Sequence, residues 1–377
     1  MRIQQLNRFR SASPRMIRQR LGFTLIEVLT VIAIIGILVG LLLAAVGPIR
    51  RTVRNAAISF EVKAIDAALN QYQAKYDSYP PDGSNQAQLI AHLRKAFPNI
   101  ATSEINLLIR DTFPGTNAPL VNFTNGAPSG VMDPCEALVF FLGGFSEDAT
   151  FPLSGEGGPF FIADANGNRM DSDKPVANRA SVQYNVSRNN PLYDFSDGKL
   201  YIDQDINAPG FTVSSDETDL FANGTFDCLP AYAISGTSAP LVYFNNRTYS
   251  YDTPNGKYFN HYRPTGSLVS GVARPYKSVD VNTTIPQARD ADAHFRYMEE
   301  DKFQIIAAGL DEDFGGIPQS GPAPVFYKFP SGEQLDITQP GGGSGFSRYT
   351  ETTGIPSSQL DNIVNFADST LENAIDQ

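Results

Sequence analysis

A single carboxylate lies in the most apolar stretch of this chain. Glu27 belongs to a run from residue 23 to 46 in which the only other polar side chains are Thr24 and Thr30. A charged side chain costs roughly 2.5–3.5 kcal/mol at the centre of a membrane and less near its surface. Glu27 lies near the start of the run, where it could reach the headgroups. A partner of opposite charge is the alternative that would offset this cost.

Cleavage of the chain between Gly22 and Phe23 would create such a partner. The new amine on Phe23 would lie one helical turn from Glu27, and in a bundle of parallel helices it could neutralise Glu27 of an adjacent subunit. A pair of this kind would also fix the axial register between subunits, which is the best-attested use of a buried polar contact. The spacing therefore predicts an assembly contact.

The apolar run predicts a membrane anchor. A helix over residues 23–46 would be about 36 Å long at ~1.5 Å per residue, enough to cross a ~30 Å hydrocarbon core. A secretory signal peptide is shorter and ends in a small-x-small cleavage site, which is missing here. Residues 1–22 contain six arginines and no acid, and three arginines closely follow the run. We therefore expect a cytoplasmic N-terminus and a body on the other side of the membrane.

This stretch closely resembles the N-terminal signal of type IV pilins and type II secretion pseudopilins. The sequence "GFTLIE" (22–27) matches the core of that signal residue by residue, and "VIAIIGIL" (31–38) continues it. The resemblance implies that a prepilin peptidase cleaves after Gly22 and methylates Phe23, and that Glu27 is the assembly carboxylate. One departure is Leu21, because many members of the family have Lys or Arg directly before the glycine.

The anchor is predicted to continue as one helix from about residue 23 to 77. Beyond the run, apolar side chains recur at steps of three and four residues, which places them on one helical face. They are Ile58, Val62, Ile65, Leu69, Tyr72 and Tyr76. The sequence "YPPDG" (79–83) should end the helix because proline lacks an N–H group, and Pro48 predicts a kink within it.

The rest of the chain predicts a β-rich body. It is rich in Gly, Pro, Tyr and Phe, which favour turns and strands. We expect short helices in 84–110, with a break at Pro98, and in 135–144, and strands in 239–245 and 303–310. The predicted fold class is α+β, with a long N-terminal helix, transmembrane and then amphipathic, packed on a β-rich globular C-terminal body.

The predicted domain organisation follows from these segments. Residues 1–22 form a basic leader, 23–46 the transmembrane half of the helix, and 47–79 its amphipathic half. Residues 80–377 form an extracytoplasmic body with an insertion at about 145–300.

A second resemblance concerns an acidic loop near the C-terminus. The sequences "KFQIIAAGLDEDFGG" (302–316) and "DNIVNF" (361–366) resemble the C-terminal region of G-type major pseudopilins, in which such a loop binds calcium. The resemblance makes Asp311, Asp313 and Asp361 candidate calcium ligands, and calcium accepts carboxylate and backbone oxygens. About 44 residues separate the loop from Asp361, whereas the family has a short connection there. Asp and Gly are also what any tight turn uses.

The two cysteines, Cys135 and Cys228, allow two interpretations. An extracytoplasmic body would permit one disulfide between them. The alternative is two separate buried thiols.

Patterns that indicate catalysis are scarce. The three histidines, His92, His261 and His294, have no metal-ligand spacing, and the serines lack a G-x-S-x-G context. The acidic segment 164–174 begins like an EF-hand but lacks the glutamate at its twelfth position, which favours a solvated turn over a different calcium turn. The net charge of −11 argues against nucleic acid as a partner.

We therefore predict a non-enzymatic structural subunit of a pilus-like filament, a pseudopilin of a type II secretion-like system. Its expected partners are prepilin peptidase, other pseudopilin subunits, the inner membrane and a secretion assembly platform. The chain would cross the inner membrane once, with its body periplasmic or extracellular. The alternative is a membrane-anchored periplasmic binding protein or enzyme that uses a prepilin-type anchor.

Overall fold

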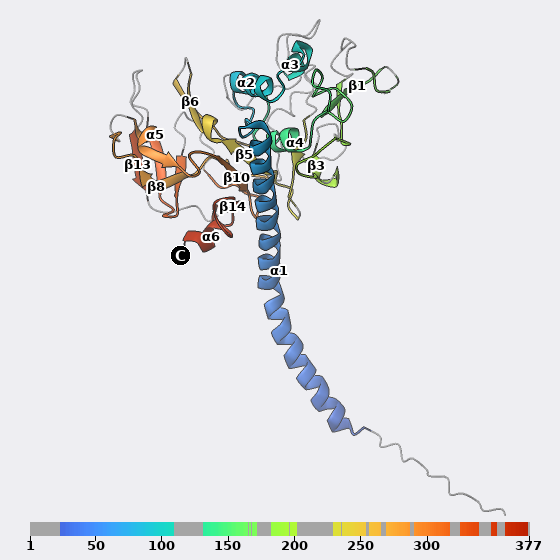
Figure 1. The fold of residues 1–377 in the computed structure, drawn as a ribbon. Coiled ribbons are helices and arrows are strands. Elements are labelled where there is room, and N and C mark those ends of the chain that lie inside the picture. The colour runs from blue at the N-terminus through green and yellow to red at the C-terminus, as the bar shows by residue number, and fades with distance from the viewer. Residues whose placement is uncertain are drawn as a thin grey trace, which may run out of the picture. The chain divides into compact units, whose positions relative to one another are not determined.

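The computed structural model describes residues 23–108, 131–164, 166, 168–171, 182–195, 197–201, 229–234, 236–253, 256–264, 269–286, 290–316, 325–338, 348–352 and 359–375. The chain divides into two compact units, residues 1–51 and 52–377. One helix, α1 (Leu25–Tyr76), begins in the first unit and ends in the second (Figure 1). The predicted single long helix is therefore confirmed, and it ends shortly before the two prolines of "YPPDG".

The first unit presents its apolar side chains to the outside. All the large hydrophobic residues from Leu25 to Leu43 are exposed. Within the described residues, α1 is the one helix long and apolar enough to cross a membrane by length and composition. This unit is consistent with membrane anchoring, because such a surface is stable in lipid and not in water. Pro48 lies inside the helix, and the kink stays a prediction.

The part of α1 that belongs to the second unit is amphipathic, as predicted. Five residues of the expected stripe are completely buried and belong to the main hydrophobic core: Ile58, Val62, Ile65, Leu69 and Tyr72. Tyr76 is partly buried against the same core. Burial of side chains of this size stabilises a fold by about 1.5–3 kcal/mol each. The stripe therefore fixes this half of α1 to the body.

The body contains several short helices (Figure 1). They are α2 (Gln86–Ala96), α3 (Thr102–Leu108), α4 (Ala137–Leu142), α5 (Ala291–His294) and α6 (Leu371–Ile375), with 3-10 turns η2 (Asp197–Lys199) and η4 (Asn246–Thr248). The break between α2 and α3 contains Pro98, and α4 ends before Gly143. Both positions agree with the sequence.

The strands form several small sheets across the described residues. One has the order β14 (Ile363–Val364), β10 (Phe303–Ala307), β5 (Val242–Asn245). A larger one has the order β13 (Arg348–Thr352), β12 (Gln334–Thr338), β11 (Val325–Phe329), β8 (Lys277–Val281), β9 (Phe295–Tyr297). The remaining strands form sheets of two strands each. These sheets pair β1 (Phe160–Ile162) with β2 (Val182–Tyr184), β3 (Leu200–Tyr201) with β4 (Ala231–Tyr232), and β6 (Ser250–Thr253) with β7 (Gly256–Phe259).

Most of these pairings are antiparallel, and β8 with β11 is parallel. The strands expected in 239–245 and 303–310 are β5 and β10, which pair with each other. The structure thus confirms the α+β class with a strand-rich C-terminal body. The domain boundaries and the insertion at about 145–300 stay predictions.

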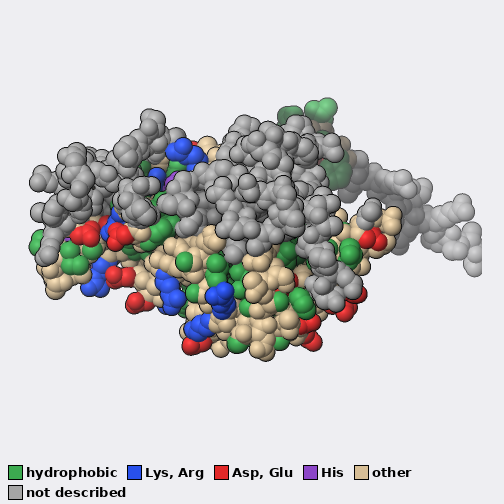
Figure 2. Space-filling model, turned by 90° about the horizontal axis from the view of Figure 1, so that it is seen from above, with side chains coloured by type: hydrophobic (Ala, Val, Ile, Leu, Met, Phe, Trp, Pro, Cys, Tyr) green, Lys and Arg blue, Asp and Glu red, His purple; other side chains and the backbone are tan. Residues whose placement is uncertain are grey.

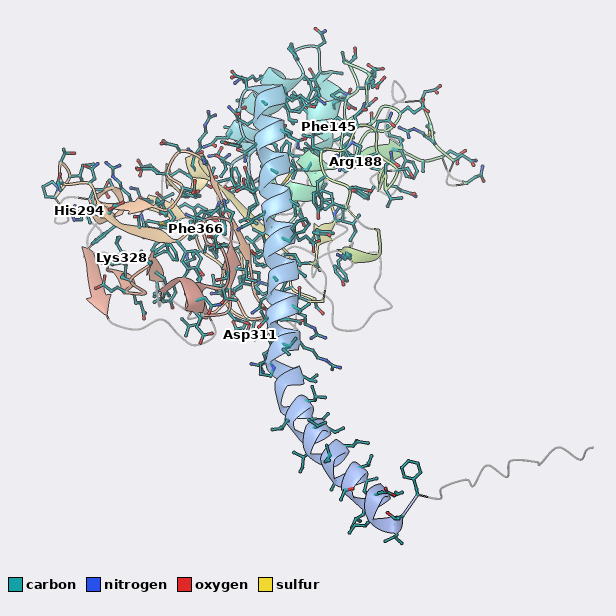
Figure 3. The ribbon with its side chains drawn as sticks, turned by 60° about the horizontal axis from the view of Figure 1, so that its bottom comes forward. Phe145, Arg188, His294, Asp311, Lys328 and Phe366 are labelled. Carbon is teal, nitrogen blue, oxygen red and sulfur yellow. The ribbon has the colours of Figure 1, made fainter. Side chains whose placement is uncertain are left out.

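An arginine completes the C-terminal end of α4. The Arg188 guanidinium donates from Nη1 to the Val139 carbonyl at 2.6 Å and from Nε to the Gly144 carbonyl at 2.9 Å. It also lies over the ring of Phe145 (Figure 3). The Val139 carbonyl also accepts the Gly143 N–H at 3.2 Å, and Arg188 Nη2 donates to the Phe140 carbonyl. Since the last carbonyls of a helix have no partner within it, Arg188 adds donors at this end of α4.

Many of the charged side chains of the body lie on its surface, although some, such as Lys277 and Asp292, are buried. Acidic and basic groups are interspersed over the described part of the face seen in Figure 2. Exposed pairs of this kind contribute little to stability, typically 0–1 kcal/mol each.

Candidate functional site

The start of α1 is closed by a hydrogen-bonded cap. Phe23 precedes the helix and is largely exposed. The carboxylate Oε2 of Glu27 accepts hydrogen bonds from the backbone N–H and the hydroxyl of Thr24, both at 2.8 Å. The backbone N–H of Glu27 in turn donates to Thr24 Oγ1 at 3.3 Å. This reciprocal pattern is a capping box, which satisfies N–H groups that the helix leaves open.

The cap gives Glu27 a partner within its own chain. Sequence reasoning assigned Glu27 to a contact between subunits and overlooked Thr24, although a threonine three residues before a glutamate is the known signature of a capping box. The two roles are compatible, because both bonds to the carboxylate end on Oε2. Gly22, the predicted cleavage residue, lies outside the described residues.

The acidic loop near the C-terminus is closed by Asp361. Strand β10 leads into this loop, and β14 pairs with β10 through Ile306 with Val364 and Ala307 with Ile363. This pairing brings Asp361, just before β14, back to the loop. Its Oδ2 accepts the backbone N–H groups of Leu310 at 3.0 Å and Asp311 at 3.2 Å.

Gly309 makes this approach feasible. Its φ angle is +72°, and a Cβ atom there would lie 2.4 Å from the Asp361 carbonyl and 2.6 Å from its carboxylate. Both the backbone conformation and the close contact require glycine. The long excursion between the loop and Asp361 therefore does not prevent them from meeting.

The structure brings two of the three predicted calcium ligands together. Burial and the adjacent Asp361 carboxylate raise the pKa of Asp311 to about 6, and burial raises the pKa of Asp361. Asp313 points elsewhere, since its Oδ1 accepts the Gly315 N–H at 2.8 Å and lies against Gly271. Two carboxyl groups held close together in this way favour a proton or a cation between them.

Unpartnered buried oxygen atoms occur on Asp361 and on residues close to it in the sequence. Three side-chain acceptors have no hydrogen-bond partner within the part of the chain that the structure describes: Gln359 Oε1, Asp361 Oδ1 and Asn362 Oδ1. Buried acceptors normally have a partner, so each such atom calls for an explanation, for example an ion. Gln359 and Asn362 were not singled out from the sequence, because an isolated amide carries no ligand signature.

Cys135 lies in a different buried cluster. Its sulfur and the carboxylates of Asp133 and Glu136 have donor atoms within 4.8 Å of one another, and all three residues are buried. Glu136 Oε2 accepts the Asp133 backbone N–H at 2.8 Å, at the start of α4. Cys228 lies outside the described residues, so the disulfide stays a prediction.

Comparison with known proteins identifies the N-terminal segment. Residues 17–43 match the family model of the prokaryotic N-terminal methylation motif. The match includes Gly22, Phe23 and Glu27. Neither the curated proteins nor the solved structures gave a match.

The motif and the helix together define a class. The chain carries a type IV pilin-like signal at the head of an exposed apolar helix, followed by a strand-rich body. The motif implies processing by prepilin peptidase and pilin-like assembly.

Proposed function

We propose that this chain is a non-enzymatic structural subunit of a pilus-like filament, a pseudopilin of a type II secretion-like system. In this proposal prepilin peptidase cleaves after Gly22 and methylates Phe23. The observation that carries the proposal is the methylation motif, which lies at the start of a helix whose large apolar side chains from Leu25 to Leu43 are all exposed.

The physical reason is that these side chains need two successive environments. Before assembly they are solvated by lipid, so the chain is held in the inner membrane with its body periplasmic or extracellular. In a filament they pack against the α1 helices of other pseudopilin subunits. Extraction from the membrane by an assembly platform connects the two states.

Charge pairing at the N-terminus sets the register of this packing. The Phe23 amine of one subunit approaches the Glu27 carboxylate of its neighbour, whose Oε2 is already held by Thr24. The capping box thus orients the carboxylate before the neighbour arrives, which lowers the entropy that assembly must overcome.

Two substitutions at Glu27 separate capping from charge pairing. Glu27→Gln keeps an acceptor for Thr24 but removes the negative charge, whereas Glu27→Leu removes both. We expect both variants to insert in the membrane at normal levels and both to lose filament assembly, measured as protein in sheared surface filaments. Normal filaments from Glu27→Gln would show that the carboxylate serves only as a cap. Normal filaments from both variants would show that assembly needs neither the cap nor the charge, and would overturn the proposed pairing of Phe23 with Glu27.

We also propose that the acidic loop binds calcium. Asp311 and Asp361 would hold the ion, with oxygens of the surrounding backbone and amides completing its shell. The support is the close carboxyl pair and the buried acceptors beside it, since calcium takes six to eight oxygen ligands. Asp313, the third predicted ligand, has its Oδ1 on the Gly315 N–H, while its own N–H donates to Asp311 Oδ1. The bound ion would neutralise the loop and hold β14 on β10.

Thermal unfolding tests this site. A ligand at a hundred times its Kd stabilises a protein by about 2.7 kcal/mol, which corresponds to a rise in Tm of roughly 5 °C for a domain of this size. We expect that rise with calcium and not with magnesium, and we expect Asp311→Asn to abolish it. An equal Tm in calcium and in chelator would rule the site out.

A further inference from the structure

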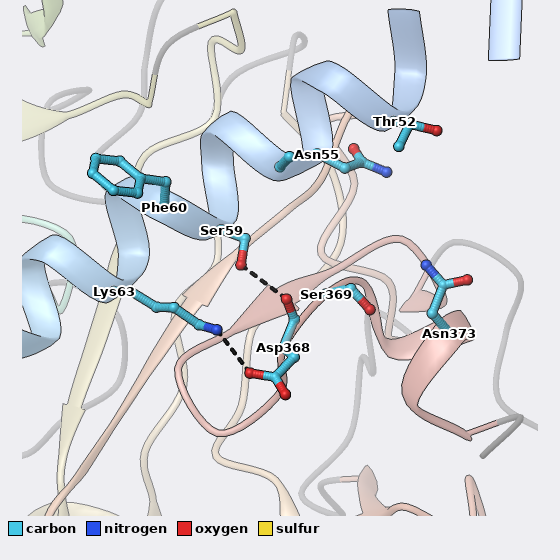
Figure 4. A pocket seen from close by; sticks show the side chains of 9 residues that line it. Thr52, Asn55, Ser59, Phe60, Lys63, Asp368, Ser369 and Asn373 are labelled. Carbon is cyan, nitrogen blue, oxygen red and sulfur yellow. Dashed lines mark hydrogen bonds and ion pairs between the residues drawn. The ribbon is translucent and has the colours of Figure 1, made fainter. Parts of the chain in front are cut away.

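A groove runs between α1 and the C-terminal segment of the body (Figure 4). Its volume is about 380 Å³. Ser59 and Lys63 of α1 join its two walls, because Ser59 Oγ donates to the Asp368 carbonyl at 3.2 Å and Lys63 Nζ contacts Asp368 Oδ1 at 2.7 Å. Two contacts therefore connect α1 to the segment around Asp368 across the groove.

The groove has polar groups that a ligand could satisfy. Asn55 Oδ1 is buried in the wall and has no hydrogen-bond partner among the residues that the structure describes. The Asp368 side chain is fully exposed although its Oδ1 contacts Lys63, and it is the one carboxylate among the residues that line the groove. An unpartnered acceptor and a carboxylate whose second oxygen faces solvent fit a cation with several N–H donors.

One large apolar side chain, that of Phe60, lies among the mostly polar residues that line the groove. Phe60 lines it and is 77% exposed, the highest exposure of any large hydrophobic side chain described in residues 52–377. Exposed aromatic side chains next to a hollow indicate a protein-binding surface. The occupant must therefore combine apolar contact with a multi-donor cation.

The chain itself carries such a combination. Arg50 and Arg54 lie four residues apart on α1, on the same face of the helix, and both are exposed. Val53 next to them is 62% exposed. A guanidinium presents five N–H donors in a fixed fork, which suits an amide oxygen and a carboxylate together.

We propose that this groove docks α1 of a second copy of the chain, with Arg54 of that copy between Asn55 and Asp368. This inference rests on the proposed filament. Pairing of the Phe23 amine with Glu27 of the next copy staggers parallel α1 helices by four residues, or about 6 Å. The same stagger sets Arg54 level with position 58, between Asn55 and Ser59 of the groove.

The contact is heterologous, since the donor and acceptor surfaces differ. Each copy offers Arg54 to one neighbour and its groove to another, so repetition gives an open helical array rather than a closed ring. The contact thus acts beyond the membrane segment as a second determinant of the register that Glu27 sets at the N-terminus.

Disulfide cross-linking between introduced cysteines tests the contact, in chains whose native Cys135 and Cys228 are replaced by alanine. Full-length Arg54→Cys and Asp368→Cys chains are co-expressed with prepilin peptidase, each carrying a different tag, and the filaments are oxidised. We expect a cross-linked dimer that contains both tags. The matched control pairs Arg54→Cys with Glu156→Cys, which places the second thiol at an exposed position elsewhere on the body, and should give no such dimer. The Tm of each variant shows that it folds.

A charge exchange provides the second measurement. Arg54→Asp or Asp368→Arg alone should reduce the yield of filaments at least tenfold, and the two together should restore a substantial part of it. Normal filaments without the mixed dimer, equal dimer in the control pair, or no rescue by the exchange would overturn the docking site and leave the filament proposal intact. Failure of the unmodified chain to form filaments would overturn both.

Discussion

His92 shows how one residue makes the stability of the body depend on pH. It is buried, with Nε2 hydrogen-bonded to the Tyr72 hydroxyl at 2.7 Å and Nδ1 to the Ser78 hydroxyl at 3.2 Å. Burial, with a smaller effect from Lys95 and Arg247, lowers the pKa of His92 to about 4. The neutral ring connects α1 to α2, and a proton on it would leave a charge in the core.

Acid should therefore weaken the fold before it titrates most carboxylates. Between the unfolded pKa of about 6.5 and the folded value of about 4, only the unfolded chain binds this proton, so stability falls as the pH falls through that range. The expected loss is about 3 kcal/mol. Urea unfolding at pH 7 and pH 4 measures it. The variant His92→Gln keeps an acceptor for Tyr72 but cannot bind the proton. It should be less stable than the unmodified chain at pH 7, and the difference in the free energy of unfolding should be smaller at pH 4. An equal difference at both pH values would contradict the role given to His92.

Residue roles could be predicted where one local pattern carried them. The match of residues 22–27 to the pilin signal was readable from the sequence because the signal is contiguous, and the methylation motif agrees with it. The residues that contact Asp361 could not be predicted from the sequence. Its hydrogen bond with Leu310 depends on the pairing of β14 with β10, and a long segment separates these two strands in the sequence. Asn55 gave no signal, because its unpartnered oxygen exists only in the folded groove.

At the scale of elements, α4 depends on a residue far away in the sequence. All six of its residues are buried, and a helix of this length cannot stabilise itself in water. Arg188 donates to its terminal carbonyls and stacks on Phe145. The sequence predicts where α4 ends, at Gly143, because glycine at that position is a local signal. It does not predict the donor, which comes from a different segment.

Removal of that donor should destabilise the body. Arg188→Leu would leave buried carbonyls without partners, and we expect a loss of about 3 kcal/mol in the free energy of unfolding. Arg188→Lys should recover only part of it, because an ammonium group cannot reproduce the planar fork. Arg94→Leu, at an exposed position on α2, is the control and should change stability by less than about 0.5 kcal/mol. Equal effects at the two positions would argue against the clamp.

The helix periodicity illustrates what a sequence can establish for an element. The stripe from Ile58 to Tyr72 is buried as its spacing predicted, because helical spacing is a local property and one face must meet a core. The sequence does not predict which strands of the body pair with each other. For example, β8 pairs in parallel with β11, which lies about fifty residues further along the chain. Non-local pairing leaves no periodic trace in either strand.

At the scale of the whole molecule, two surfaces could contact other copies of the chain. The exposed apolar side chains of residues 25–43 suit lipid first and neighbouring helices later. The groove lined by Asn55 and Asp368 offers a polar contact beyond that segment. The first surface would serve a simple membrane anchor equally well, so the groove is the feature that distinguishes the proposed filament subunit from such an anchor.

The most direct test of the filament account is to purify filaments from the cells, whether they are periplasmic or on the surface, and to determine the N-terminal sequence and intact mass of the subunit. The account predicts this chain in the filament fraction, beginning at Phe23 and heavier than the cleaved sequence by one methyl group. A chain found only in membranes, or one that still begins at Met1, would contradict it.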